Sequence, residues 1–184
     1  MNEGTPQHRP IFSSYPHRIS AIRWVSSFLL VVFLVYIWAG FLRGDLRSFK
    51  VISSSMEPTL KVGDYVLTRR VRAGEQLRGH IVAFEDSQNP GELLTKRVVA
   101  VEGDAVELVE GVLYINGRAE NPEFPRIIRM PSRSWRVGVG EIFVVGDNRN
   151  NSVDSIDYGP IPVSQLVGVV FLRYWPPHAV GFVK

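Results

Sequence analysis

The stretch LLTKRVVAVEGDAVELVEGVLYING, residues 93–117, decides the fold class, because its apolar residues come in short runs separated by turn residues. Residues 98–101, 105–109 and 112–115 are rich in valine, isoleucine and leucine, as extended strands are. The pairs Glu110-Gly111 and Asn116-Gly117 are typical of tight turns. We therefore expect residues 105–115 to form a β-hairpin.

Similar short runs recur outside this stretch, at residues 65–68, 80–84, 142–145 and 167–174. Residues 121–134 contain three prolines and are expected to form a surface loop. No clear helix is predicted after residue 42. The chain has 184 residues, 45% of them hydrophobic, which suits one domain with an appendage. The pattern predicts a mainly β domain, a small sheet or barrel.

The appendage is the run WVSSFLLVVFLVYIWAGFL, residues 24–42, which carries no charge. As a helix it would extend about 29 Å, roughly the thickness of a hydrocarbon core. Two alternatives remain open: a cleaved signal peptide, which would be shorter and end in an A-x-A-like site, and a buried core helix. Lys and Arg residues are nearly balanced on the two sides, so the positive-inside rule does not fix the orientation.

The composition of the chain limits the kinds of binding partner and site that it can have. The formal net charge is +3, and the basic residues are scattered without a nucleic-acid-binding signature, so membrane lipid is a better partner than nucleic acid. There is no cysteine, which excludes disulfides and thiolate metal sites.

Three consecutive serines stand in ISSSMEPTLKVGDYV, residues 52–66. A serine before a β domain is most often a turn or cap residue, and a nucleophilic serine needs a base. The four histidines stand in no recognisable triad context. Lysine can replace histidine when burial keeps its amine neutral, and Lys96 lies in an apolar stretch. The alternative is a strand-end lysine that reaches back to water.

Four boxes, SSSMEPTL, GDYVL, TKRVVAVEGD and GDNRNNSVDS, resemble the type I signal peptidases in order and spacing, over roughly residues 50–175. These are membrane-anchored Ser/Lys endopeptidases. The resemblance implies that Ser55 is the nucleophile and Lys96 its general base. It implies that Ser53 supplies an oxyanion-hole hydroxyl and that Ser152 orients the lysine amine. Ser54 is expected only to space its neighbours.

The sequence departs from the commonest pattern of this family at three positions. Asn150 stands where aspartate is usual, and His80 stands where aspartate often precedes the strand. Ile156 stands where an arginine often pairs with the acidic residue that matches Asp154. These changes put the ionic support of the active-site floor in doubt and leave the predicted dyad intact.

The resemblance implies a peptidase that removes signal peptides from exported preproteins after small residues, without a metal or an organic cofactor. The substrate would add a strand along residues 51–53 and 93–95. The predicted substrate-binding residues are Val51, Ile52, Met56, Leu93, Leu94 and Thr95.

The implied arrangement in the cell (plasma) membrane is a cytoplasmic segment 1–23, a transmembrane helix 24–42 and an extracytoplasmic β-rich peptidase domain 43–184. Two alternatives remain: a specialised peptidase with a narrow client list, as in pilin or conjugation systems, and a catalytically dead membrane scaffold. Retention of Ser55, Lys96 and Ser152 argues against the scaffold. The oligomeric state does not follow from the sequence.

Overall fold

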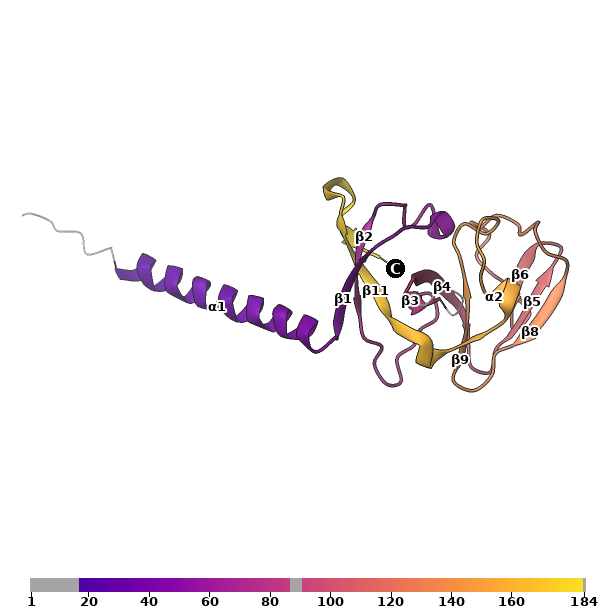
Figure 1. Cartoon of the computed structure of the whole chain (residues 1–184), viewed down its shortest axis with the longest axis horizontal. Coiled ribbons are helices and arrows are strands. Elements are labelled where there is room, and N and C mark those ends of the chain that lie inside the picture. Colours follow the sequence, from indigo (N-terminus) through magenta and orange to yellow (C-terminus); the bar gives the residue numbers. More distant parts are fainter. Residues whose placement is uncertain (1–16, 87–90, 184) are drawn as a thin grey trace, which may run out of the picture. The chain divides into compact units, whose positions relative to one another are not determined.

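The computed structural model describes residues 17–86 and 91–183 of the chain, which divides into two compact units at residues 42 and 43 (Figure 1). Residues 1–16 of the predicted cytoplasmic segment therefore lie outside the described residues. The first unit contains the helix α1, His17–Leu42. The second contains the strands.

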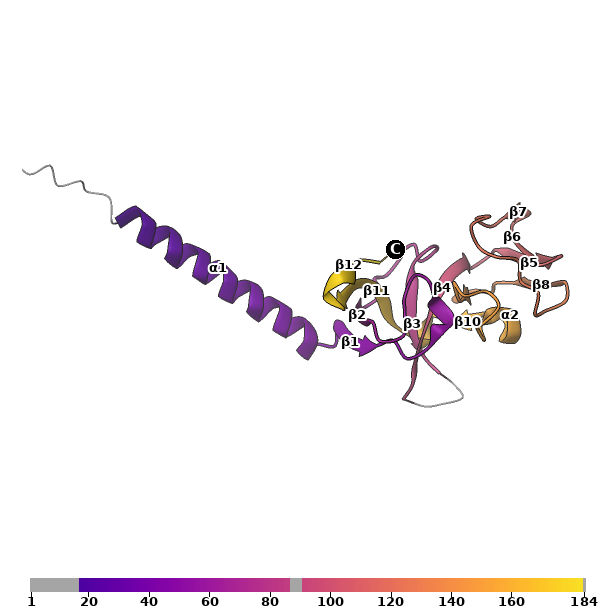
Figure 2. The same ribbon diagram turned by 90° about the horizontal axis from the view of Figure 1, so that it is seen from above.

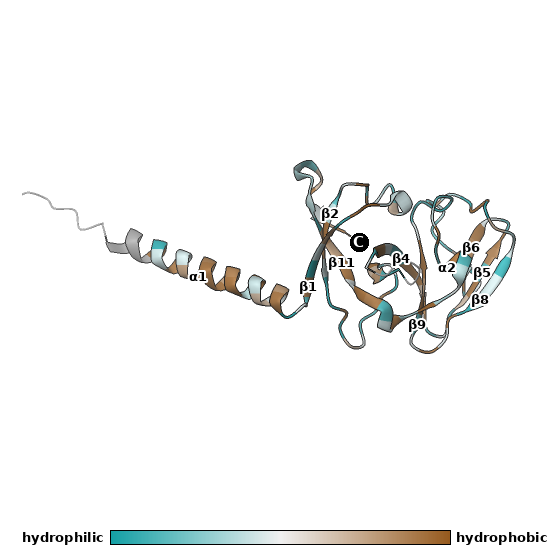
Figure 3. Ribbon diagram, viewed as in Figure 1, coloured by the Kyte–Doolittle hydropathy of each residue, from teal (hydrophilic) through white to brown (hydrophobic). Residues whose placement is uncertain are grey.

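Helix α1 contains the predicted apolar run and begins seven residues before it. Its stretch Ile22–Leu42 is long and apolar enough to cross a membrane. Figure 3 shows this part of α1 mostly in the colour of hydrophobic residues. Apolar side chains such as Phe28 and Leu34 are exposed, which argues against the alternative of a buried core helix.

The larger sheet of the second unit is antiparallel throughout, in the order β1-β2-β11-β3-β4-β9-β10, with β12 paired to β11. Its strands are β1 Leu46–Lys50, β2 Tyr65–Arg69, β3 Ile81–Glu85, β4 Leu93–Val101, β9 Glu141–Val145, β10 Ile161–Pro162, β11 Leu166–Trp175 and β12 Gly181–Phe182.

A second, four-stranded antiparallel sheet has the order β7-β6-β5-β8, visible at one end of the unit in Figure 2. Its strands are β5 Ala105–Val109, β6 Val112–Ile115, β7 Arg118–Ala119 and β8 Arg133–Arg136. Strands β5 and β6 are the predicted hairpin. Glu110 and Gly111 both have positive φ, as a tight hairpin turn with a right-handed twist requires.

The predicted mainly β fold is confirmed, with two corrections. Strands β1, β7, β8, β10 and β12 were not predicted, and β8 begins inside the segment 121–134 that was predicted to be a loop. A short helix α2, Ser155–Tyr158, begins at the last residue of the last motif, where no helix was expected. These elements are short or polar, so partners distant in sequence stabilise them more than local propensity does.

Strand β4 places the site because it changes neighbours along its length. Residues 93–97 pair with β3, whereas pairing with β9 begins only at Arg97. The first half of β4 therefore has one edge free of β9. A one-turn 3-10 helix, η1, Ser54–Met56, contacts β4. Buried residues on both sides, such as Val82, Val98 and Met56, hold these elements in the core.

Candidate active site

Ser55 is the central residue of η1 and is almost completely buried. Ser53 caps this turn, since its Oγ accepts a hydrogen bond from Ser55 N at 3.2 Å. Met56 and Leu60 anchor the same segment in the core, and Leu60 N donates to Met56 O. A polar side chain is thus held on a turn whose flanks are fixed by apolar packing.

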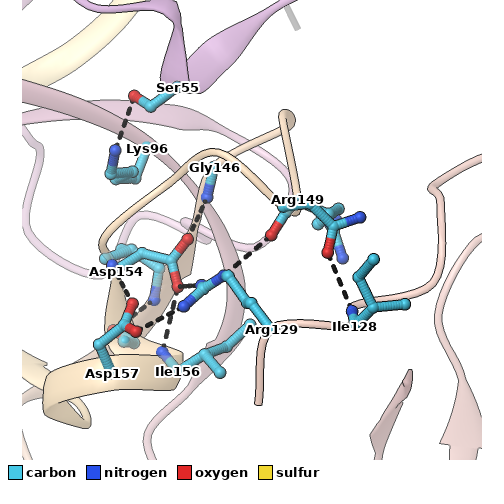
Figure 4. Close-up of polar contacts among 12 residues, drawn as sticks. Ser55, Lys96, Ile128, Arg129, Gly146, Arg149, Asp154, Ile156 and Asp157 are labelled. Carbon is cyan, nitrogen blue, oxygen red and sulfur yellow. Dashed lines mark hydrogen bonds and ion pairs between the residues drawn. The ribbon is translucent and has the colours of Figure 1, made fainter. Parts of the chain in front are cut away.

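Lys96 lies on β4 opposite Val82 of β3, with only 2% of its surface exposed. Its Nζ is 2.7 Å from Ser55 Oγ, within hydrogen-bonding distance (Figure 4). No carboxylate among the described residues forms a salt bridge with this amine. The structure therefore brings together the two residues predicted to form the dyad, which are separated by 41 positions in the sequence.

The protonation of Lys96 follows from its surroundings. Burial lowers the pKa of Lys96 from 10.5 to about 8, because the charged form loses its hydration in the protein interior. A lysine with this pKa has a substantial neutral fraction near neutral pH, whereas a free lysine has almost none. Its lone pair is then available to accept the proton of the Ser55 hydroxyl.

Asp147 joins three of the four sequence boxes around the dyad. Arg97, the neighbour of Lys96, donates from Nε to Asp147 Oδ1 at 2.8 Å and from a terminal nitrogen to Oδ2 at 2.7 Å. Thr59, which follows η1, donates its hydroxyl to Asp147 Oδ2. Because side chains alternate along a strand, Arg97 can make this pair while Lys96 faces Ser55.

Two asparagines of the GDNRNNS segment hold η1 directly. Asn148 N donates to Ser55 O at 3.0 Å, and its side chain donates to Ser54 O at 3.1 Å. Asn151 donates to Ser54 Oγ at 3.0 Å. The expectation that Ser54 only spaces its neighbours is therefore wrong: its hydroxyl and carbonyl are points at which η1 is fastened.

The two supporting serines have different surroundings. Ser53 Oγ accepts a hydrogen bond from Ser55 N, so the two groups of the predicted oxyanion hole lie next to each other. For Ser55 N–H to stabilise an oxyanion, it must share or give up its bond to Ser53. Ser152 Oγ is buried without a hydrogen-bond partner among the described residues, and no bond to Lys96 Nζ is present there. Its predicted orienting role stays a prediction.

Gly146 allows the end of β9 to lie close to both Ser152 and Ser55. A Cβ at this position would lie 2.3 Å from Ser152 Oγ and 2.5 Å from the carbonyl oxygen of Ser55. Both distances are far below van der Waals contact. A residue without a side chain is therefore needed where the β9 end meets η1.

A cleft of about 620 Å³ opens beside the dyad. Its lining includes the two dyad residues, Ser53, Ser54, Ser152, apolar residues of β3, β4 and β10, and the segment after Ser152.

Of the six predicted substrate-binding residues, Leu94 lines this cleft. Val51, Met56 and Thr95 are buried, whereas Ile52 is 63% exposed. Their role, with that of Leu93, stays a prediction. Sequence reasoning did not single out Phe84, Tyr158 or Ile161, which also line the cleft.

Two of the departures from the family pattern, Ile156 and His80, are held by contacts other than an ion pair. Ile156 is completely buried and packs in the core with Phe143 and Val145. His80 is held through its backbone, since its N–H donates to Leu77 O and its carbonyl accepts from Val98 N.

Across residues 17–86 and 91–183, no group of three or more His, Cys, Asp or Glu side chains is placed to hold a metal ion.

Comparison with known proteins places this geometry in a family. The family described as signal peptidase, peptidase S26, matches residues 21–175. Probable signal peptidase I-2 of Synechocystis sp. is 34% identical over 141 residues, 71% of this chain and 64% of that protein. Probable thylakoidal processing peptidase 2 of Arabidopsis thaliana is 36% identical over 139 residues, 70% of this chain and 38% of that protein.

Signal peptidase IB of Staphylococcus aureus is 28% identical over 176 residues, which are 84% of this chain and 90% of that protein. The chain thus spans about two fifths to two thirds of the length of the plant and cyanobacterial relatives. The match of the family to residues 21–175 takes in η1, β4 and the GDNRNNS segment, and the chain belongs to the signal peptidase family, peptidase S26.

Proposed function

We propose that this chain is a membrane-bound serine endopeptidase that uses Ser55 and Lys96 to cleave signal peptides from exported preproteins after small residues. The observation that carries the proposal is the contact of 2.7 Å between a buried lysine amine and a buried serine hydroxyl. A lysine that served only to solubilise a strand end would place its amine in water.

In the proposed reaction, neutral Lys96 takes the proton of Ser55 while Oγ attacks the carbonyl carbon of the scissile bond. Negative charge develops on the carbonyl oxygen, where Ser55 N–H and the Ser53 hydroxyl donate. The Lys96 ammonium then protonates the leaving amine, and an acyl ester on Ser55 remains. Water, deprotonated by Lys96, hydrolyses this ester and regenerates the serine.

The free edge of β4 supports the proposed mode of substrate binding. Residues 93–96 pair with β3 on one side only among the described strands, so an extended peptide can add its backbone to the other side. Leu94 and Lys96 point into the cleft there. A peptide bound along this edge would present a carbonyl to Ser55 and its alternate side chains to the cleft.

Helix α1 supports the proposed membrane anchor, since its span Ile22–Leu42 suits a bilayer. We place the N-terminal segment in the cytoplasm and the β-rich unit outside the cell membrane. Protease added to spheroplasts should then degrade the β-rich unit and spare an N-terminal tag. Degradation of the tag with survival of the β-rich unit would reverse the orientation.

The test of function is incubation of the full chain in detergent with a preprotein, followed by mass spectrometry of the new N-terminus. One new N-terminus, directly after a small residue, is expected for the wild type and is not expected for Ser55→Ala. The absence of cleavage by a folded wild type would favour a scaffold. If depletion leaves only one or two exported proteins uncleaved, the client list is narrow rather than general.

A further inference from the structure

Asp154 is a buried carboxylate beneath the dyad, with no exposed side-chain surface. One of its oxygens accepts from Gly146 N at 3.0 Å, and the other accepts from Ile156 N at 3.1 Å, which caps α2. A Cβ on Gly146 would overlap both Ser152 Oγ and the carbonyl oxygen of Ser55, so the backbone group that Asp154 holds lies directly beside the active-site serines. A buried carboxylate of this kind requires a compensating cation.

The cation is Arg129. One terminal nitrogen of its guanidinium donates to Asp154 Oδ1 at 3.1 Å, and the other donates to Asp157 Oδ1. Its Nε donates to the backbone oxygen of Arg149 at 3.1 Å (Figure 4). All three nitrogens of the planar fork are therefore used, and two of them face carboxylates.

Arg129 belongs to the segment between β7 and β8, predicted to be a surface loop, and core packing and three hydrogen bonds hold this part of it. Ile127 is buried in the core, and its N–H donates to Gly111 O at 2.8 Å. Asn150 accepts from Ile128 N at 2.9 Å through its oxygen and donates to Arg126 O at 2.9 Å through its nitrogen. A carboxylate at position 150 could accept the first bond but could not donate the second.

We propose that Arg129 is a positioning residue of the active site: it pairs with Asp154 and Asp157 beneath the dyad and offsets part of their negative charge, and Asn150 fastens the loop that delivers it. The guanidinium expected at position 156 is thus supplied from a segment more than twenty residues upstream. Two departures from the family pattern, Asn150 and Ile156, are parts of this one arrangement. The inference rests on the proposed function only for its effect on turnover.

The charge of Arg129 acts on Lys96. Burial is the largest influence on the pKa of Lys96, followed by the carboxylate of Asp154, which raises it. The positive charge of Arg129 then lowers that pKa, and the carboxylate of Asp157 raises it. Without Arg129, the two carboxylates beneath the dyad would act on the lysine alone and favour the ammonium form.

The other residues around Lys96 are considered element by element. Its partner in β3 is Val82, and η1 contributes uncharged Ser55. Arg97 pairs with Asp147. Three further titratable residues line the cleft: Glu85, Asp86 and Tyr158. The Arg129 cluster is therefore the ionic group beneath the dyad whose removal is expected to move the protonation of Lys96.

The proposal is tested by measuring the pKa of Lys96 directly, by NMR of the full chain in detergent with lysine isotopically labelled at its ε carbon. The chain contains only four lysines, Lys50, Lys61, Lys96 and Lys184, so the Lys96 signal can be assigned from its loss in Lys96→Met. Titration gives the pKa whether or not the protein turns over a substrate. The variants are Arg129→Ala, Arg129→Lys and the matched control Arg126→Ala. Arg126 lies in the same loop as Arg129, and its side chain donates to Glu110 O.

We expect Arg129→Ala to raise the pKa of Lys96 by about one pH unit. Arg129→Lys keeps the charge and loses the fork, so the pKa should stay near that of the wild type while kcat falls. Arg126→Ala should change neither quantity. If Arg129→Ala does not fold, Arg129→Gln, which keeps one donor and loses the charge, takes its place. An unchanged pKa of Lys96 in the folded neutral variant would overturn the proposal.

Activity separates this inference from the proposed function. In Arg129→Ala, the acid limb of kcat/KM should move to higher pH with the pKa of Lys96, so that activity falls about tenfold at pH 7 and recovers in alkali. A loss that is equal at every pH would show a purely structural role and would overturn the proposal. If Arg129→Ala raises the pKa of Lys96 but the wild type cleaves no preprotein, the proposed peptidase function is refuted and the role of Arg129 stands.

Discussion

Replacing Lys96 with methionine should abolish turnover and make the protein more stable. Lys96 is 2% exposed and its pKa falls from 10.5 to about 8 on folding, mainly because burial penalises its charge. A difference of that size corresponds to about 3 kcal/mol that the folded state loses when the amine is charged in solution. Methionine has a similar length and no charge, so the variant avoids this cost.

The sign and the pH range follow from the two pKa values. Between about pH 8 and pH 10.5 the unfolded chain binds the proton more tightly than the folded chain does, so wild-type stability rises with pH in this range. Below it the full destabilisation is present, and above it none remains. The gain in stability of Lys96→Met should therefore be up to about 3 kcal/mol near pH 7 and should vanish near pH 10.5.

The assay is urea unfolding of the full chain in detergent, followed by near-ultraviolet circular dichroism at several pH values. Lys61→Met is the matched control, because Lys61 is exposed and its replacement should give no pH-dependent difference. A Lys96→Met variant less stable than the wild type at neutral pH would refute the reasoning. So would a gain in stability that does not depend on pH, since it would arise from packing and not from the amine.

Three further substitutions test the site. Ser55→Ala should remove all turnover and leave the melting temperature near that of the wild type; full activity would move the nucleophile elsewhere. Ser53→Ala should lower kcat about a hundredfold, or about 3 kcal/mol, if its hydroxyl stabilises the oxyanion, and unchanged kcat would remove it from that role. Gly146→Ala should lower both activity and thermal stability, because its Cβ would overlap Ser152 Oγ and the Ser55 carbonyl. A fully active, equally stable Gly146→Ala protein would contradict that close approach.

The proximity of Ser55 and Lys96 could be predicted from sequence because both residues stand in recognisable local patterns. Ser55 stands in a distinctive box, and the apolar residues around Lys96 indicate a strand that buries its side chains. The structure places both where those patterns indicate, although 41 positions separate them. The short polar strand β8 left no comparable trace, because its pairing with β5 depends on residues far along the chain.

Arg129 could not be found in the same way. It lies in a proline-containing segment, 25 residues before Asp154 and 28 before Asp157, with no periodic pattern to join them. The available signal was indirect: an arginine was missing at position 156, while a buried acidic residue remained at position 154. A buried carboxylate without a partner requires a cation from elsewhere in the chain. Several arginines lie in that segment, and the sequence alone does not show which of them is the partner.

The chemistry of the site explains why the cations beside it are arginines. A lysine can act as a base only if no nearby carboxylate holds its proton, yet Asp147 and Asp154 are both buried close to the dyad segments. Each of these carboxylates pairs with a guanidinium: Asp147 with Arg97, and Asp154 with Arg129, which it shares with Asp157. Both ion pairs are made through charge-assisted hydrogen bonds from the fork of an arginine, so each carboxylate has a partner other than the amine of Lys96. Lysine in either place would keep the positive charge but would lose the planar fork, so the hydrogen bonds that hold the carboxylate in place would be fewer.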